Sequence, residues 1–340
     1  MKMNKKDRVF SGTRPSGKLH LGNYLGAIKG YIKLQDRRNL DCIYGVVDLH
    51  GITMKYTKYE AENFQTQIRD VVLDYLGAGL DPKKCHILIQ SQVPEHVELA
   101  YLLGTICPVD RIIKLPAYKD GKRLHPKNDN MGLLYYPILM AADILIYKAK
   151  LVPIGKDQEP HLEVTREIAR KFNSTFSPIF PEPKRFASKV DIVPSLLGTG
   201  EDEKNKKMSK SVKGSYILLT DDLRRIKERL AKVPTDIGHG KALPKEGGVV
   251  SLLELVELFM DKRARENYEK QYLGRGIKYA ELKEKLAQAI YQELEPIQKK
   301  RKYYEDHPQE VDEILEEGRK YCSKIAKETL REAKEAMGLI

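Results

Sequence analysis

The first half of the chain alternates short apolar runs with stretches that have helical spacing. Residues 42–47 and 86–90 are apolar runs typical of buried strands, whereas residues 58–77 place apolar side chains at helical intervals. This alternation predicts βαβ units, and therefore a parallel sheet whose ligands bind beyond the carboxyl ends of the strands. The site is expected in the loops that follow Phe10, Val47, Ile89 and Ile154.

The string His20-Leu21-Gly22-Asn23 lies after the first strand-like run, at the start of the first expected helix. An apolar run at residues 8–10 and a Gly/Pro-rich turn at 11–17 precede it, and a helix is expected over residues 19–34. A helix N-terminus attracts anions, and His20 and Asn23 can donate hydrogen bonds to phosphate oxygens. The alternative is that the string is only a turn.

A second string, Lys207-Met208-Ser209-Lys210-Ser211, lies far along the chain. It places two ammonium groups and two hydroxyls in a loop, residues 198–214, that is flanked by glycines. A flexible cationic loop is suited to negative charge that develops during a reaction. Alternatively, it is a solvated surface loop.

The two strings, in this order and with a sheet-forming segment between them, resemble the signatures of the class I aminoacyl-tRNA synthetases. The second string matches the family pattern completely. The resemblance implies an α/β fold: a Rossmann-like parallel-sheet catalytic domain with a helical insertion, followed by an α-helical C-terminal domain. It also implies that the catalytic residues are His20, Asn23, Lys207 and Lys210.

Length and composition agree with this expectation. At 340 residues the chain is long enough for two domains, because single cores tend to divide beyond ~250–300 residues. A net charge of +12 favours a polyanionic partner. The longest apolar stretch, residues 132–147, is interrupted by Pro137 and Asp143, and residues 1–7 lack the apolar core of a signal peptide. We therefore expect a cytoplasmic protein without a membrane segment.

The four cysteines show no metal-ligand spacing. Some members of the resembled family carry an iron–sulfur cluster near the C-terminus, where this chain has one cysteine, Cys322. One thiolate cannot hold such a cluster. We expect neither an iron–sulfur cluster nor a structural zinc.

The most discriminating segment is residues 132–145, in which Asp143 places a carboxylate among apolar neighbours. A buried carboxylate needs a donor, or its pKa rises. The donor can belong to the protein, as in a structural hydrogen bond, or to a substrate. The indole N–H only donates. An acceptor fixed in an apolar slot would therefore suit tryptophan.

Residues 136–145 resemble the amino-acid-binding helix of the bacterial-type tryptophanyl members of this family, and matching segments run from Phe10 to Leu339. The resemblance implies that Asp143 accepts the indole N–H. It implies apolar walls from Phe10, Met140, Ile144, Val152 and Ile154. The expected reaction is ATP-dependent activation of L-tryptophan and its transfer to tRNA(Trp), with Mg²⁺ carried on the ATP phosphates. A homodimer is implied by resemblance alone.

The same resemblance assigns residues to the ATP site. They are Arg14, Pro15, Ser16, Gly22, Asn23, Gly155, Lys156, Asp157, Val193, Lys207, Met208, Ser209, Lys210 and Ser211. Two positions depart from the family pattern. Arg14 stands where Gln is common and Lys156 where Glu is common. Both departures add positive charge, so ATP affinity or metal dependence is expected to differ.

Residues 93–135 form the expected insertion, which in the family carries the dimer contact and a loop that meets pyrophosphate. Residues 118–127 are polar and cationic, and are expected to form this loop. Lys119 and Lys122 are both candidates for the pyrophosphate contact. An ordinary exposed connection is the alternative.

The composition changes after the second string. Residues 219–230, 251–262, 278–293 and 308–337 have helical spacing, with breaks at Pro234, Gly240, Gly247, Gly274 and Pro296. We expect a catalytic domain at 1–216, a helical anticodon-binding domain at 217–302, and C-terminal helices at 303–340 that could pack back on the catalytic domain.

Three other functions are compatible with parts of this pattern. A tyrosyl-tRNA synthetase shares both strings but is disfavoured by the context of Asp143. A paralogue that senses tryptophan or ATP without charging tRNA would have no use for the complete second string. A nucleotidyl transferase shares the first string but lacks the C-terminal helices.

Overall fold

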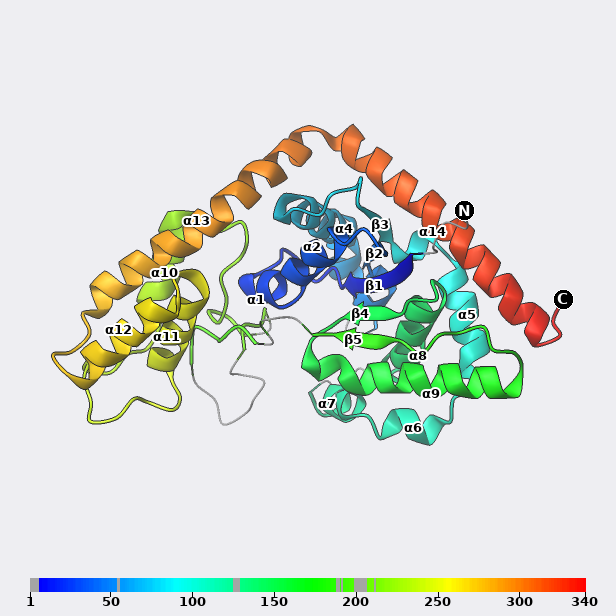
Figure 1. Cartoon of the computed structure of the whole chain (residues 1–340), viewed down its shortest axis with the longest axis horizontal. Coiled ribbons are helices and arrows are strands. Elements are labelled where there is room, and N and C mark those ends of the chain that lie inside the picture. The colour runs from blue at the N-terminus through cyan, green and yellow to red at the C-terminus, as the bar shows by residue number, and fades with distance from the viewer. Residues whose placement is uncertain are drawn as a thin grey trace. The chain divides into compact units, whose positions relative to one another are not determined.

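A computed structural model describes residues 6–53, 56–124, 129–187, 190, 192–198, 207–210 and 212–340. The described residues contain a five-stranded sheet of order β3-β2-β1-β4-β5, in which all neighbouring strands are parallel (Figure 1). The strands are β1 (Asp7–Thr13), β2 (Leu40–Val46), β3 (Cys85–Ile89), β4 (Leu151–Pro153) and β5 (Lys184–Phe186). The strand order reverses direction at β1 and β4, which is the switch point where doubly wound sheets bind ligands. The predicted fold class is confirmed.

Helices connect the strands as the βαβ pattern requires. After β1 come α1 (Leu21–Asn23), a π-helical turn η1 (Tyr24–Ile28) and α2 (Lys29–Gln35), which together replace the single helix predicted over 19–34. The other connections contain α3 (Asp48–Gly51), α4 (Lys58–Ala78), η2 (Gln90–Gln92), α5 (Glu95–Gly104), α6 (Val109–Ile113), α7 (Pro116–Leu124), α8 (Met131–Leu145), η4 (Lys156–Gln158) and α9 (Glu159–Thr175). The remaining helices are α10 (Leu223–Ala231), α11 (Gly248–Phe259), α12 (Lys262–Leu273), α13 (Tyr279–Asp306) and α14 (Pro308–Ala336).

The chain forms two compact units. The first comprises the described parts of Met1–Gly17, Gly30–Ser188 and Tyr304–Ile340, and the second those of Lys18–Lys29 and Lys189–Tyr303. This division differs from the boundary expected at residue 216. The reason is local pairing: the Leu21 amide donates to the Ile217 carbonyl, and the Leu219 amide donates to the Leu19 carbonyl. These bonds group the first signature with the second.

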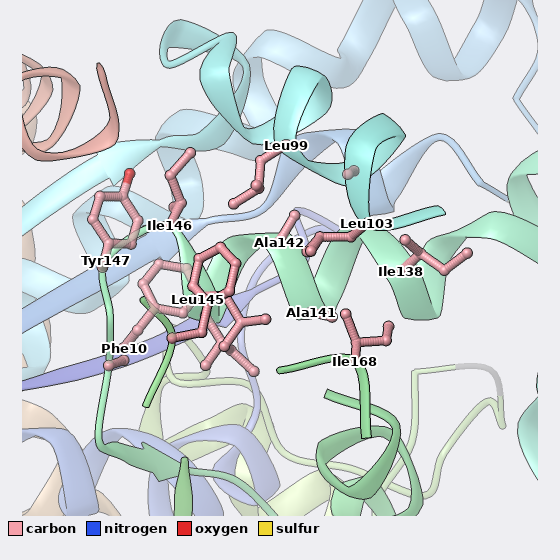
Figure 2. Packing of buried hydrophobic residues seen from close by; sticks show 14 of the residues in the cluster. Phe10, Leu99, Leu103, Ile138, Ala141, Ala142, Leu145, Ile146, Tyr147 and Ile168 are labelled. Atoms are coloured by element: carbon pink, nitrogen blue, oxygen red, sulfur yellow. The ribbon is translucent and has the colours of Figure 1, made fainter. Parts of the chain in front are cut away.

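The main core of the first unit surrounds α8, which is apolar on nearly all sides. Figure 2 shows Ile138, Ala141, Ala142 and Leu145 of this helix packed among side chains of other elements. The neighbours labelled there are Phe10 of β1, Leu99 and Leu103 of α5, Ile168 of α9, and Ile146 and Tyr147 just after α8. A helix that is hydrophobic all round is buried, and Asp143 is 2% exposed within it.

The C-terminal helix α14 packs against β3 and α5 of the first unit. The approach to β3 is close at Gly318, where an added Cβ would lie 1.9 Å from the Ile87 carbonyl oxygen. Farther along α14, Cys322, Ile325 and Ala326 join the core around α8. The helix is therefore part of the structure that supports the candidate site.

Two local expectations were wrong. The segment 118–127 was expected to be a loop, but α7 covers Pro116–Leu124, because Gly121 is buried beside Leu133 and gives this polar stretch a packed side. A break was expected at Pro296, but α13 continues through it. Leu294 and Ile297 on either side are buried, and tertiary packing of this kind can outweigh the local cost of proline.

Candidate active site

His20 caps the helix that follows the first signature. Its Nδ1 accepts from the Gly22 amide at 3.0 Å, while Asn23 Oδ1 accepts from the His20 amide at 3.1 Å. Burial, followed by the positive charges of Lys210 and Lys207, lowers the pKa of His20 to about 4. The ring is therefore neutral near pH 7. Because Nδ1 accepts, the ring proton is on Nε2, from which it can be donated to a ligand.

The second signature lies beside the first within the second unit. Met208 is buried, its amide donates to the Val193 carbonyl at 3.0 Å, and its Cβ lies 3.5 Å from the position that a Cβ on Gly22 would take. Lys210 Nζ donates to the Lys18 carbonyl at 3.1 Å. The Ser209 amide donates to the Ser215 hydroxyl. The structure thus groups these predicted nucleotide-site residues: His20, Gly22, Asn23, Val193, Lys207, Met208, Ser209 and Lys210. Ser211 lies outside the described residues.

Asp143 is held by three protein donors. Its Oδ2 accepts from His50 Nε2 at 2.8 Å, and its Oδ1 accepts from Gln90 Nε2 at 2.7 Å and from His96 Nδ1 at 2.6 Å. Burial raises the pKa of Asp143, but the hydrogen bonds from the two histidines lower it by more. The net pKa therefore lies well below its usual range. The carboxylate is ionised and fixed in position.

Sequence reasoning did not identify the partners of Asp143. His50 and Gln90 follow β2 and β3, at the carboxyl ends of the strands, and sheet topology alone would have marked those positions. His96, on α5, and Tyr147, after α8, carried no comparable signal. They are recognised only because folding brings His96 to the carboxylate and the Tyr147 hydroxyl to His96.

The predicted walls of the tryptophan site divide into two groups. Phe10, Ile144 and Val152 are buried members of the core around α8, and the Phe10 ring stacks on Tyr147 at 5.3 Å between centroids. Met140 and Ile154 are partly buried and pack against that core. The second group is more exposed than the first.

The turns after β1 and β4 lie at the switch point of the sheet. Of the residues predicted there, Arg14 and Ser16 are exposed and Pro15 is buried after β1, while Gly155 is half-buried and Lys156 and Asp157 are exposed after β4. The positive charge of Arg14 lowers the pKa of both Tyr136 and His161. Burial is the larger effect: it raises the pKa of Tyr136 to about 12 and lowers that of His161 to about 4. The Tyr136 hydroxyl and His161 Nε2 are hydrogen-bonded at 2.8 Å.

Both candidates for the pyrophosphate contact lie on α7. Lys119 and Lys122 are exposed, and Lys122 pairs with Asp129 at 2.7 Å. Residues 125–128 of the expected loop lie outside the described residues. Within the described part of the chain, no group of three or more His, Cys, Asp or Glu residues could hold a metal ion. No described helix is both long enough and apolar enough to cross a membrane.

Comparison with known proteins places the chain in a family. Residues 1–295 match the model described as tRNA synthetases class I (W and Y), so the chain belongs to this family. Within it, the chain belongs with the tryptophan–tRNA ligases. It is 38% identical to that of Clostridium tetani over 343 residues, covering 100% of this chain and 98% of the relative. It is 40% identical to that of Helicobacter pylori over 339 residues, covering 98% and 99%.

Solved structures agree. The tryptophanyl-tRNA synthetase of Campylobacter jejuni, solved in complex with ADP and tryptophan, matches with a TM-score of 0.80 and 28% identity, over 97% of this chain and 99% of that one.

Proposed function

We propose that the chain activates L-tryptophan with ATP and transfers the tryptophanyl group to tRNA(Trp). The observation that carries this proposal is the fixed, ionised carboxylate of Asp143 within an apolar core. The near full-length similarity to tryptophan–tRNA ligases supports it. An indole N–H is the donor that suits such an acceptor, and Met140 and Ile154 offer apolar contact beside it.

The reaction has two steps. A carboxylate oxygen of tryptophan attacks the α-phosphorus of ATP, forming the acyl–phosphate bond of tryptophanyl-adenylate and releasing pyrophosphate. A terminal ribose hydroxyl of the tRNA then attacks the carbonyl carbon, forming the ester and releasing AMP. Neither step needs a nucleophile from the protein. Catalysis here depends on positioning and on stabilisation of negative charge.

The grouped signature residues have the properties this chemistry requires. Neutral His20 donates from Nε2, Asn23 donates from its amide nitrogen, and Lys207 and Lys210 place positive charge against the phosphates. The same proposal assigns nucleotide contacts to Arg14, Pro15, Ser16, Gly22, Gly155, Lys156, Asp157, Val193, Met208, Ser209 and Ser211. Mg²⁺ would arrive on the ATP phosphates, because it favours phosphate and water oxygens over an all-protein site. Lys119 or Lys122 would meet the pyrophosphate.

We also infer that the protein works as a homodimer in the cytoplasm. Large apolar side chains are exposed on neighbouring elements of the insertion: Val97 and Tyr101 on α5, Val109 and Ile113 on α6, and Met131 at the start of α8. Surfaces of this kind are typical of protein interfaces. We propose that a second copy of the chain covers this surface, which agrees with the dimer expected from the family. The cytoplasm is where tRNA charging supplies translation.

Replacement of the carboxylate tests the proposed specificity. In an Asp143→Ala variant, we expect the preference for tryptophan over phenylalanine to fall by a large part of the ~10⁴–10⁵ that one buried hydrogen bond can provide. Relative kcat/KM values in ATP–pyrophosphate exchange measure this preference. Asp41→Ala is the control, since it removes a carboxylate paired with Arg8 in the same unit. An unchanged preference in Asp143→Ala would refute the assignment.

A further inference from the structure

The two oxygens of Asp143 are not equivalent. A carboxylate oxygen accepts about two hydrogen bonds. Oδ1 already accepts from Gln90 at 2.7 Å and from His96 at 2.6 Å, so both of its acceptor positions are used. Among the residues that the structure describes, His50 alone donates to Oδ2. An additional donor would therefore find its place at Oδ2.

His96 is bonded through both ring nitrogens. Nδ1 faces Asp143 Oδ1, and Nε2 lies 2.7 Å from the Tyr147 hydroxyl. An ionised carboxylate can only accept, so Nδ1 must carry a proton. In the neutral ring Nε2 then accepts, and the Tyr147 O–H is its donor. Burial raises the pKa of Tyr147 well above its usual value, so this hydroxyl keeps its proton.

The surroundings fix this chain of hydrogen bonds. The His96 side chain is 0% exposed, as is Tyr147. The Tyr147 ring stacks on Phe10 and meets the His96 ring edge-on, with centroids 5.3 Å apart in both pairs. Ring packing therefore holds Tyr147 even without its hydroxyl. The hydroxyl also interacts with the Cys322 thiol, and its contact with Nε2 selects the tautomer of His96.

We propose that Tyr147 and His96 are positioning residues for amino-acid specificity: they fix Asp143 so that Oδ2 is the oxygen offered to the indole N–H. This inference rests on the proposed function of Asp143 and adds two residues buried behind it. Tyr147 selects the His96 tautomer that donates from Nδ1, and that donation saturates Oδ1. Specificity would thus depend on a hydroxyl two hydrogen bonds away from the carboxylate.

A Tyr147→Phe variant tests the proposal with little change in packing. Dissociation constants, measured by calorimetry on the full chain, are compared for tryptophan and for its analogue with sulfur in place of the indole N–H. We expect the preference for tryptophan over the analogue to fall roughly 3- to 10-fold, the effect of about one weakened hydrogen bond. ATP affinity should not change. An unchanged preference would overturn the proposal.

Tyr75→Phe is the matched control. Tyr75 is also 0% exposed in the first unit, but its hydroxyl donates to the Gly45 carbonyl at 3.2 Å. The preference should be that of the wild type in this variant. An equal fall in both variants would mean a general loss of packing, and would also overturn the proposal.

The tautomer can be observed without any ligand. The chain has 8 histidines, and ¹⁵N NMR of the histidine-labelled protein at neutral pH, assigned with a His96→Asn variant, reports the state of each ring nitrogen. We expect His96 to be protonated at Nδ1 and unprotonated at Nε2, and the other tautomer to increase in Tyr147→Phe. A wild-type ring protonated only at Nε2, or at both nitrogens, would contradict the proposal.

Substitution of His96 separates positioning from packing. The amide nitrogen of asparagine can take the place of Nδ1, so His96→Asn should keep most of the preference that His96→Leu loses. Equal behaviour of these two variants would count against the proposal. If Asp143→Ala keeps the tryptophan preference, the proposed function itself fails. If Asp143→Ala loses it while Tyr147→Phe and His96→Leu keep it, only this inference fails.

Discussion

The side chains of the two signatures have different proposed roles toward the phosphates: one donates a hydrogen bond and two bring positive charge. His20 is kept neutral by burial and by the neighbouring lysines, and its position is fixed by the reciprocal bonds with Gly22 and Asn23. It can donate a hydrogen bond but brings no charge. Positive charge comes from Lys207 and Lys210, which suits them to negative charge that grows in the transition state.

Lys210→Ala should therefore affect the chemical step more than ATP binding. We expect the rate of adenylate formation to fall by about 10²- to 10³-fold, the usual effect of losing one such donor, with ATP affinity changed much less. Single-turnover kinetics separates the two quantities. Lys213→Ala, which removes an exposed lysine of the same segment, is the control. Equal losses of rate and affinity in Lys210→Ala would show that this lysine acts in the ground state.

At this scale the sequence predicted the central carboxylate but not its partners. Asp143 was identifiable because a carboxylate within an apolar run needs a hydrogen-bond donor, which its apolar neighbours do not provide. His50, Gln90 and His96 lie on three other segments, and their convergence on Asp143 depends on how strands and helices pack. One sequence contains no direct record of that convergence.

Among the secondary-structure elements, the long helices and the buried strands β2 and β3 were predicted well, whereas β5 and α7 were not. Helices expected over 58–77 and 308–337 are observed at Lys58–Ala78 and Pro308–Ala336. Many turns of consistent spacing make such helices evident. The strand β5 has three residues and depends on its pairing with β4, and the polar helix α7 depends on packing at Gly121. Tertiary contacts decide elements of this length.

The contact between α14 and β3 gives a prediction for one such element. Gly318→Ala would bring a methyl group against the Ile87 carbonyl oxygen, and we expect the free energy of unfolding to fall by about 1–3 kcal/mol. Urea denaturation, with hydrogen exchange along α14, measures this change. Gly30→Ala is the control, because that helical glycine has nothing within 4 Å of an added Cβ and should gain about 0.5–1 kcal/mol. A Gly318→Ala protein as stable as the wild type would show that α14 is not tightly docked.

For the whole molecule, the insertion between β3 and α8 carries the surface that we propose for the dimer. Its exposed apolar side chains contrast with a chain whose composition is 32% charged. Tyr101 alone is 69% exposed. The two signatures lie in the second unit, and Asp143 lies in the first.

Tyr101→Glu should weaken the proposed dimer, because a charge would be buried in the interface. We expect the sedimenting mass to fall from about twice 39.0 kDa to that of a single chain at micromolar concentration. Tyr59→Glu is the control, since Tyr59 is 73% exposed on α4, outside the insertion. A dimer that persists in Tyr101→Glu would place the interface elsewhere.

The most direct test of the central claim is ATP–pyrophosphate exchange with the purified full chain, run with tryptophan, with tyrosine, and without an amino acid. We predict exchange that depends on tryptophan alone, because we propose that Asp143 accepts the indole N–H, a group that tyrosine lacks. Exchange that depends on tyrosine would contradict this account of specificity. The absence of exchange with any amino acid would contradict the proposed chemistry.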